Sequence, residues 1–254
     1  MSGLWAVLYR EYLMRVTSSL WLFFDLLVPV LYLLVFGVGF NAAFGSGIET
    51  GGRMLSYNEF FVAGVLCMAC FGLSMNQSYG FFTDRDNGIF YETLTYPITR
   101  GEFLLGKILF QCVLAVAQTL FTLLAATLIL GVSISVGAVP VILGGVLLGT
   151  AGWFFTFAAF AFRVRRSDTF NTVLNLAYFL LLFLSSLFYP LDKLPSAFVV
   201  VAYANPVTWQ TDVLRWAING TGTLEIVALE AVGFLVFSIV CFRVALRSLE
   251  KALE

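Results

Sequence analysis

The residues best suited to binding a partner or performing chemistry lie in a polar segment, residues 83–102, between two long apolar runs. The segment carries Asp, Arg and Glu side chains, so it is too polar to lie in the hydrocarbon of a membrane. Apolar residues recur in it at helical spacing, at Ile89, Phe90, Leu94 and Ile98. This spacing predicts a short amphipathic helix that ends before Pro97. We expect its apolar face to bind either a groove on a cytoplasmic partner or the membrane surface.

The chain contains few residues that are candidates for catalysis. The sequence contains no histidine and no close pair of carboxylates within an apolar run, which a membrane-embedded transferase would need in a cavity. Asp84 and Asp86 are close enough to suggest a metal site, but their position favours N-capping of the amphipathic helix. Cys67 and Cys70 form a C-x-x-C pair without a second pair, so they are interpreted as packing residues. We expect neither a metal nor a cofactor in this chain.

The composition indicates the class of protein. Of 254 residues, 60% are hydrophobic and 11% are charged, far from the averages of soluble domains. Apolar runs long enough to cross a bilayer recur along the chain, which is typical of a polytopic membrane protein. The net charge of −1 provides no basic face for phosphates, so no nucleic-acid partner is expected.

Membrane-spanning helices must position the polar segment, and the hydropathy pattern predicts six of them. Their expected bounds are 21–41, 59–81, 104–131, 138–162, 170–189 and 225–246. Residues 3–20 are amphipathic and suit a helix in the headgroup plane, with one face formed by Trp5, Leu8, Tyr12, Val16 and Leu20. We therefore predict an all-α fold in a single domain, residues 1–254, made of an interface helix (1–20), five spans (21–189), an outer re-entrant hairpin (190–224) and a last span with a cytoplasmic tail (225–254).

Lys and Arg residues predict the orientation. All but three of the 14 fall on one side of the predicted spans, the exceptions being Arg53, Lys193 and Arg215. Because cytoplasmic loops carry the excess of positive charge, both termini, the polar segment and a basic turn at 163–169 are expected in the cytoplasm. The pattern predicts a multi-pass protein of the cytoplasmic membrane.

A long outer segment precedes the last span and is interrupted by proline. Pro190 and Pro195 follow the fifth predicted span, and residues 197–204 form an apolar run too short to cross a bilayer. Asn205-Pro206 restarts the chain, and a second short helix is predicted over 207–218. The two helices would form a hairpin that enters the outer leaflet and returns.

The second helix of this hairpin carries one acidic and one basic residue. Asp212 and Arg215 lie three positions apart, so they share a helix face. Pairing between them would lower the free-energy cost of placing either charge near hydrocarbon.

Two motifs give the chain a family resemblance. The first follows the pattern G-T-x-E-x-L-x-x-T-P-I-x-R-x-E-x-L-x-G-K and is matched at Gly88, Leu94, Pro97, Ile98, Arg100, Glu102, Leu105, Gly106 and Lys107. The second follows F-P-L-x-x-L-P, then N-P-L-T, then an acidic residue and Arg, and is matched at Tyr189, Pro190, Leu191, Leu194, Pro195, Asn205, Pro206, Val207, Thr208, Asp212 and Arg215. With these motifs the whole chain resembles the transmembrane subunit of a type-2 ABC exporter, a group that includes permeases for polysaccharides, lipo-oligosaccharides and anthracycline drugs.

The resemblance implies a division of labour between two kinds of subunit. Such a permease binds no ATP itself, and the chain has no G-x-x-x-x-G-K-[ST] motif. A separate ABC ATPase, which uses ATP and Mg²⁺, would dock on a coupling helix and the basic turn, through Asp86, Gly88, Phe90, Glu92, Leu94, Pro97, Arg165 and Arg166. Two copies of the chain would form the pathway for an amphipathic or lipid-linked substrate. The hairpin would act as an outer gate through Pro190, Pro195, Asn205, Pro206, Asp212 and Arg215.

Residues that could line a substrate pathway each have a second explanation. Asp25, one turn into the first span, is explained by snorkelling or by pairing with a nearby Arg, or alternatively by a role at the substrate entrance. Aromatic rows along the first and fifth spans would stack on sugars, as the resemblance to polysaccharide exporters implies, or would pack against lipid and core; they comprise Tyr32, Phe36, Phe40, Tyr178, Phe183 and Phe188. Outside the resemblance, a multi-span membrane enzyme and a channel or anchor subunit not driven by ATP remain alternatives.

Overall fold

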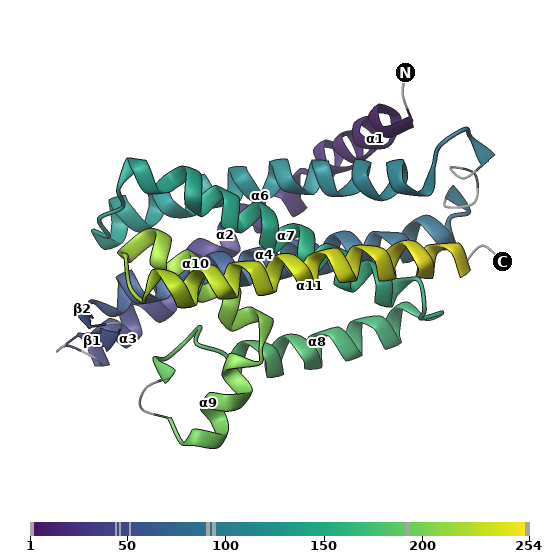
Figure 1. Ribbon diagram of the computed structural model, residues 1–254. Coiled ribbons are helices and arrows are strands. Elements are labelled where there is room, and N and C mark those ends of the chain that lie inside the picture. Colours follow the sequence, from purple (N-terminus) through teal and green to yellow (C-terminus); the bar gives the residue numbers. More distant parts are fainter. Residues whose placement is uncertain are drawn as a thin grey trace.

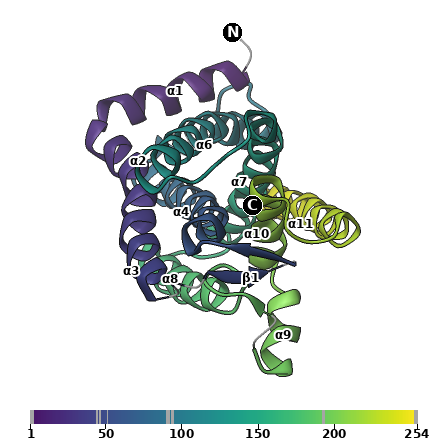
Figure 2. The same cartoon turned by 90° about the vertical axis from the view of Figure 1, so that its left-hand side faces the viewer.

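Helix α4, Tyr57–Asp86, occupies the middle of a helical bundle, and the other long helices pack around it (Figure 1). The computed structural model describes residues 3–43, 45, 47–50, 52–89, 92, 95–191 and 194–251. Viewed end-on in Figure 2, α4 is enclosed by α2 (Ser19–Tyr32), α6 (Arg100–Leu130), α7 (Val139–Ala161), α8 (Ser167–Phe183) and α10 (Pro206–Asn219). Helix α11 (Leu224–Lys251) packs on α7 and α10, and α1 (Gly3–Thr17) packs on the outside of α6.

Local signals in the sequence explain where the long helices begin and end. Ser56 and Glu59 form a capping box at the start of α4, and Thr99 and Glu102 form another at the start of α6. Gly131, with a φ of 69°, ends α6 in the left-handed conformation that glycine adopts without strain. The positions at which these helices begin and end therefore follow from residues close to each boundary.

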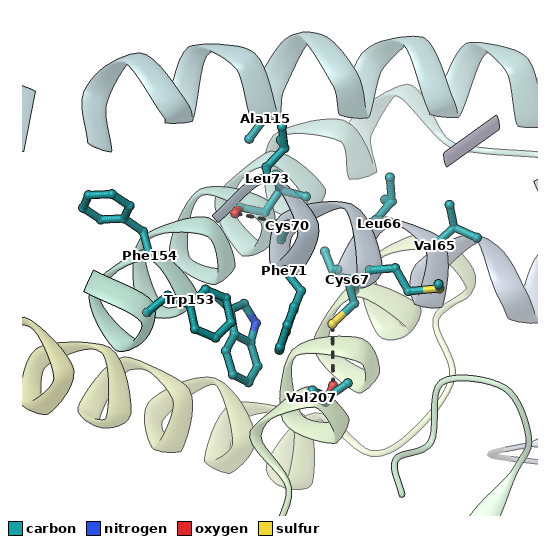
Figure 3. Packing of buried hydrophobic residues seen from close by; sticks show 14 of the residues in the cluster. Val65, Leu66, Cys67, Cys70, Phe71, Leu73, Ala115, Trp153, Phe154 and Val207 are labelled. Atoms are coloured by element: carbon teal, nitrogen blue, oxygen red, sulfur yellow. Dashed lines mark hydrogen bonds between the residues drawn. The ribbon is translucent and has the colours of Figure 1, made fainter. Parts of the chain in front are cut away.

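The core around α4 is built from large aromatic side chains. The Phe71 ring lies 4.8 Å from Trp153 of α7 and 4.7 Å from Phe157, centroid to centroid, and Figure 3 shows Phe71 beside Trp153. Cys67 and Cys70 are buried in the same core, where Cys67 Sγ lies 3.9 Å from the carbonyl oxygen of Val207. The C-x-x-C pair therefore occupies packing positions, as the sequence predicted.

Five helices in the described part of the chain are long and apolar enough to cross a membrane: Leu20–Ala42, Tyr57–Asp86, Arg100–Leu130, Val136–Ala161 and Leu224–Lys251. The first of them combines α2 with the π-helix η1 (Leu33–Val38) and α3 (Gly39–Ala43). The fourth begins with the short 3₁₀ turn η2 (Val136–Ala138).

The predicted span at 170–189 corresponds to the shorter helix α8, which has 17 residues and ends at Phe183. The prediction of a helix to residue 189 was therefore wrong. The side chain of Asn205 donates hydrogen bonds to the carbonyls of Leu181 and Leu184, at 2.7 and 3.0 Å. These bonds satisfy carbonyls at the end of α8, so the helix ends there and the chain turns back into the bundle.

The segment between the first two spans contains a small β-hairpin, which the all-α prediction did not include. Strands β1 (Ile48–Thr50) and β2 (Arg53–Leu55) are antiparallel, with Ile48 opposite Leu55. Each strand has three residues, which is too short for an alternating hydrophobic pattern to be recognised. The Arg53 guanidinium donates a 2.7 Å hydrogen bond to the carbonyl of Asn219, so the hairpin contacts the end of α10.

The polar segment is divided between several elements. Residues 83–86 form the last turn of α4, so Asp84 and Asp86 lie at a helix C-terminus and the N-capping interpretation was wrong. Gly88, with a φ of 74°, follows this helix end. Among the described residues that follow, Ile89, Glu92 and Thr95 are helical and residues 96–97 form a bend, which agrees with a short helix that ends before Pro97.

The two short helices predicted before the last span are present as α9 (Ser196–Tyr203) and α10. Helix α10 is packed among α4, α7 and α11, whereas α9 projects from the bundle at the lower left of Figure 1. This end of the bundle also carries the β-hairpin. The opposite end, on the right, carries the start of α1, the end of α11 and the turn between α7 and α8.

Candidate functional site

The end of α4 and the turn between α7 and α8 are joined by one side chain. Arg85 donates hydrogen bonds to the carbonyls of Val164, at 3.3 Å, and Arg165, at 2.5 Å. Its guanidinium also lies 4.8 Å from the centroid of the Phe82 ring. The polar segment and the basic turn, which are about 80 residues apart in the sequence, therefore form one surface, which we call the coupling surface after the role that the sequence predicted for it.

The coupling surface presents most of the residues that the sequence selected for partner contact. The described members Asp86, Gly88, Glu92, Pro97, Arg165 and Arg166 are all exposed. Phe90 and Leu94 lie outside the described residues. Arg166 forms an exposed ion pair with Asp168 at 3.4 Å, which contributes little to stability because water screens it.

Ile98, which was predicted to face a partner or the membrane surface, packs closely against the start of α1 in the same chain. A Cβ placed on Gly3 would lie 2.9 Å from an Ile98 side-chain carbon. Pro97 and Ile98 line a groove of about 380 Å³ together with Val7 and Arg10 of α1. The N-terminal helix of the same chain therefore occupies part of the apolar face that was assigned to a partner.

A buried cluster of charged side chains lies behind the coupling surface. Lys107 of α6 contacts Glu11 of α1 at 2.7 Å and Asp84 of α4 at 3.0 Å. Arg10 pairs with the same two carboxylates, and Gln77 donates a 2.7 Å hydrogen bond to Glu11. Glu11 and Asp84 are each 4% exposed and Lys107 is 1% exposed. Two cations and two anions thus balance within one group, which we call the inner ion cluster.

The charge on Arg10 is maintained by this arrangement. Burial by itself would lower the pKa of the guanidinium, since it disfavours the charged form. The hydrogen bond and charge of Asp84, together with the charge of Glu11, outweigh burial and raise the pKa above its usual value. Arg10 is therefore a permanent cation of the cluster.

Helix α1 reaches the inner ion cluster because Gly106 lets it approach α6 closely. A Cβ at Gly106 would lie 2.7 Å from the Cβ of Val7 and 3.2 Å from the carbonyl oxygen of Leu4. The aromatic face of α1, which includes Trp5 and Tyr12, points away from the bundle and is exposed. The Gly106-Lys107 pair of the first motif thus has a structural role: the glycine admits α1, and the lysine binds it.

A second polar network holds the segment of α9 and α10 that was predicted as an outer hairpin. Arg215 donates to Asp212 at 2.6 Å and to the carbonyl of Ser186 at 2.7 Å, so the predicted pair is confirmed. Ser186 Oγ donates to Asp212 at 2.7 Å. Arg215 also lies 4.0 Å from the Phe60 ring centroid, in a cation–π contact with α4.

Asn205 and the prolines set the path of the hairpin. The Asn205 side chain accepts from the Val207 amide at 3.0 Å, and so caps α10 while its amide group caps α8. Pro206 occupies the first turn of α10, and Pro195 precedes α9. Pro190 lies in the half-buried chain after α8. The N-P motif therefore joins the end of one helix to the start of another.

Two adjoining cavities open beside the first span. The inner one, about 310 Å³, is lined by members of the inner ion cluster and by Arg15. The second, about 200 Å³, is lined mainly by apolar residues together with Asp25, Tyr32 and Tyr178. Trp21 and Asn76 border both cavities, so the two lie next to each other along α4.

A family model described as "ABC-2 type transporter" matches residues 2–219, most of the chain. The chain belongs to the ABC-2 type transporter family. It is 26% identical over 201 residues to the daunorubicin resistance ABC transporter permease protein DrrB1 of Streptomyces coeruleorubidus, covering 77% of this chain and 67% of that protein. It is 25% identical over 237 residues to the putative transport permease ycf38 of Cyanophora paradoxa, covering 84% and 79% of the two chains. This chain is thus a membrane-embedded permease subunit of the ABC-2 type.

In this ABC-2 permease, the position of Asp25 is explained by pairing with a nearby arginine, which is one of the two explanations predicted from the sequence. Asp25 forms an ion pair with Arg15, and its main-chain carbonyl accepts a hydrogen bond from Gln118. Pairing with a nearby arginine accounts for a carboxylate at this depth. Because Asp25 also borders the 200 Å³ cavity, the pair stands at the edge of that space.

The predicted aromatic rows of the first and fifth spans meet in the structure of the permease. Phe36 stacks on Tyr32 and Phe40, at 5.9 Å in both cases, and lies 5.8 Å from Phe188. Phe183 is 4.9 Å from Phe188. Ring-to-ring packing therefore accounts for much of this surface, while Phe40 and Phe183 keep an exposed edge and Tyr178 borders the cavity.

The inner ion cluster is a feature of the permease that the sequence did not predict. Glu11 and Asp84 lie 96 and 23 positions from Lys107, so no local spacing connects them. The one available signal was the presence of Lys107 inside an apolar run, where an unpaired charge would be expensive.

Proposed function

We propose that this permease is the transmembrane half of an ATP-driven exporter of the cytoplasmic membrane. Two copies of the chain form the pathway, and a separate ABC ATPase, which binds ATP and Mg²⁺, drives it. The transported molecule is amphipathic or lipid-linked, and it moves outward from the cytoplasm or the inner leaflet. The chain itself carries no catalytic step.

The observation that carries the proposal is the joining of α4 to the turn before α8 by Arg85. An ATPase that binds Asp86, Gly88, Phe90, Glu92, Leu94 and Pro97 would also contact Arg165 and Arg166. Both carboxylates and guanidinium groups are exposed on this surface, which suits a partner that carries charges of both signs. Movement of the ATPase would then act on two spans at once.

The inner ion cluster supports transmission of that movement. Because Lys107 binds carboxylates from both α1 and α4, the three helices beneath the coupling surface are fastened together. The binding energy of the closed ATPase would shift an equilibrium between inward-open and outward-open arrangements of the permease. The hairpin formed by α9 and α10 is the outer gate in this proposal.

The proposed topology has six spans, with both termini in the cytoplasm. Helix α8, at 17 residues and about 25 Å, is at the short limit for a bilayer core and would be the fifth span. The excess of Lys and Arg at the end of the bundle that carries the coupling surface supports the orientation. The hairpin would then enter the membrane from the outside.

The cavities beside the first span support an amphipathic substrate. An apolar space of about 200 Å³ adjoins one of about 310 Å³ that charged side chains border, so a molecule with an apolar part and a charged part finds a matching surface. The name of the Streptomyces relative, which includes daunorubicin resistance, favours a drug. The aromatic edges of Phe40 and Phe183 are compatible with a glycan, and the lipid-linked class remains within the proposal.

The partner assignment is tested by charge reversal on the coupling surface. Glu92 is exposed, and Glu92→Lys is expected to weaken association of the nanodisc-embedded permease with its cognate ABC ATPase about tenfold. Vanadate-sensitive ATP turnover of the complex should fall in parallel. Glu49→Lys, an equivalent reversal on β1 at the opposite end, is the matched control and should change neither quantity.

Two results would contradict the assignment. Association that is weakened by Glu49→Lys and unaffected by Glu92→Lys would move the ATPase to the other end of the bundle. Transport that continues at the wild-type rate in cells that lack the cognate ABC ATPase would remove the ATP-driven mechanism.

A further inference from the structure

A small polar cavity lies at the end of the bundle opposite the coupling surface, beside the proposed outer gate, whose residues Asp212 and Arg215 form part of its wall. It has a volume of about 160 Å³. The turn between α10 and α11 and the first two turns of α11 form most of its wall. Its lining residues are Thr50, Tyr203, Asp212, Arg215, Thr221, Gly222, Thr223, Ile226, Val227 and Glu230. We call it the Glu230 cavity.

The charges that line the Glu230 cavity do not balance. Arg215 directs one terminal nitrogen to Asp212, at 2.6 Å, and the other to the carbonyl of Ser186, at 2.7 Å. This pair neutralises one of the two carboxylates. Glu230 is 7% exposed, and its Oε2 has no hydrogen-bond partner among the described residues. The cavity therefore contains one carboxylate in excess.

Burial disfavours the ionised form of a carboxyl group whose oxygen has no hydrogen-bond donor, so the group takes up a proton unless a cation stabilises its charge. A cation with a single charge in the cavity would supply this stabilisation. The hydroxyl groups of Thr221 and Thr223 would supply further oxygen atoms. A divalent ion fits less well, since Ca²⁺ takes six to eight oxygen ligands and Arg215 already adds a fixed positive charge.

We propose that the Glu230 cavity binds a singly charged cation, with Glu230 as its counter-ion. The cation is either a free alkali-metal ion or the ammonium group of a larger molecule, because oxygen ligands suit both. A cavity of about 150 Å³ in another protein holds benzene, so the space here admits a short alkylammonium as well as a metal ion. The site does not depend on ATP-driven transport.

Binding is measured on the full chain in phosphatidylcholine nanodiscs, by the thermal unfolding midpoint. A ligand that binds the folded state raises this midpoint in a saturable way. The probes are NaCl, KCl and propylammonium chloride, each at an ionic strength kept constant with tetraethylammonium chloride, whose cation has no N–H group. If sodium or potassium has the lowest half-saturating concentration, the site is assigned to a free ion. If propylammonium has the lowest half-saturating concentration, the site is assigned to an ammonium group.

Glu230→Gln keeps the shape of the side chain and removes its charge. We expect the half-saturating concentration to rise at least tenfold in this variant. Glu225→Gln, an exposed position on the same helix, is the matched control and should respond as the wild type does. Equal responses in wild type and Glu230→Gln, or no saturable response to any probe in the wild type, would overturn the proposal.

A second measurement needs no variant. Dicyclohexylcarbodiimide modifies carboxyl groups in apolar surroundings, and mass spectrometry of the wild-type chain reports its reaction at Glu230. The bound cation is expected to slow this reaction several-fold while leaving the reaction at Glu225 unchanged. A rate at Glu230 that is independent of all three probe cations would overturn the proposal.

Discussion

Lys107 of α6 and Glu11 of α1 form a buried ion pair, with 2.7 Å between Nζ and Oε1. The same ammonium group lies 3.0 Å from Asp84, so one side chain connects three helices. Because the three groups are buried, salt and water screen their attraction only weakly. The helices that meet at the base of the coupling surface are therefore expected to move together rather than one by one.

Replacing Lys107 with methionine should destabilise the permease strongly. The substitution keeps an apolar stem of similar length but leaves two buried carboxylates with Arg10 as their only cation. Loss of one partner from a buried ion pair costs about 3–5 kcal/mol. The expected result is a lower thermal unfolding midpoint in detergent.

Lys251→Met, at an exposed position on α11, is the control and should leave the midpoint unchanged. Glu11→Gln in the Lys107→Met background should recover part of the loss, because it removes the excess negative charge. An equal midpoint for wild type and Lys107→Met would show that the inner ion cluster does not hold the helices together.

A methyl group at Gly106 should push α1 away from α6. The new Cβ would lie 2.7 Å from Val7 Cβ, and overpacking of this kind costs about 1–3 kcal/mol. We expect Gly106→Ala to lower the unfolding midpoint and to accelerate proteolysis within α1. Gly101→Ala on the same helix meets no atom within 4 Å, so it should be neutral or slightly stabilising.

The double variant Gly106→Ala with Val7→Gly, which removes the Val7 Cβ that the new methyl group would meet, distinguishes a steric cause from a loss of helix integrity. Val7 is buried, so its truncation alone should also be destabilising. If the clash is the cause, the two changes together should destabilise less than the sum of their separate effects. If the two destabilising effects simply add, contact with Val7 is not the reason why Gly106→Ala destabilises the permease.

Features set by neighbouring residues could be predicted from the sequence, whereas features set by distant residues could not. The Asp212–Arg215 pair was predicted because the two residues are three apart on one helix. The end of α8 was not, because Asn205 caps it from 24 residues away. The inner ion cluster was missed for the same reason, since its members come from α1, α4 and α6.

The polar segment illustrates both outcomes. Its helical spacing and the stop before Pro97 depend on local sequence, and the described residues Ile89, Glu92 and Thr95 are helical. The C-terminal end of α4 is set by Gly88, which adopts a left-handed conformation just after the helix. The sequence-based boundary came several residues too early, so Asp84 was assigned to a helix start when it lies at a buried helix end.

Removal of the Arg85 side chain should loosen the basic turn without unfolding the bundle. The variant Arg85→Ala loses hydrogen bonds to the carbonyls of Val164 and Arg165. Because the site is partly exposed, the expected effect is about 1 kcal/mol, or about a fivefold rise in amide hydrogen exchange over residues 163–166. Arg163→Ala, at an exposed position in the same turn, should leave the exchange rate nearly unchanged. Equal rates of amide hydrogen exchange in the two variants would show that Arg85 does not hold the turn against the end of α4.

Substitution of Arg215 should affect the outer gate and leave the coupling surface intact. Arg215→Ala would leave Asp212 without its cation and the Ser186 carbonyl without its donor, in a region packed against Phe60 of α4. The loss of a buried partner is expected to cost about 3–5 kcal/mol locally. Transport should fall more than tenfold, while association with the ATPase remains at the wild-type level.

Arg215→Lys provides the graded comparison that separates the gate from the fold. A lysine keeps the positive charge beside Asp212, but one ammonium group does not reproduce the fork with which Arg215 reaches both Asp212 and Ser186. Transport by this variant should lie between wild type and Arg215→Ala, with an unfolding midpoint close to wild type. If either variant lost the ATPase while the bundle remained folded, α10 would contribute to the coupling surface. The two ends of the permease would then not have the separate roles assigned to them.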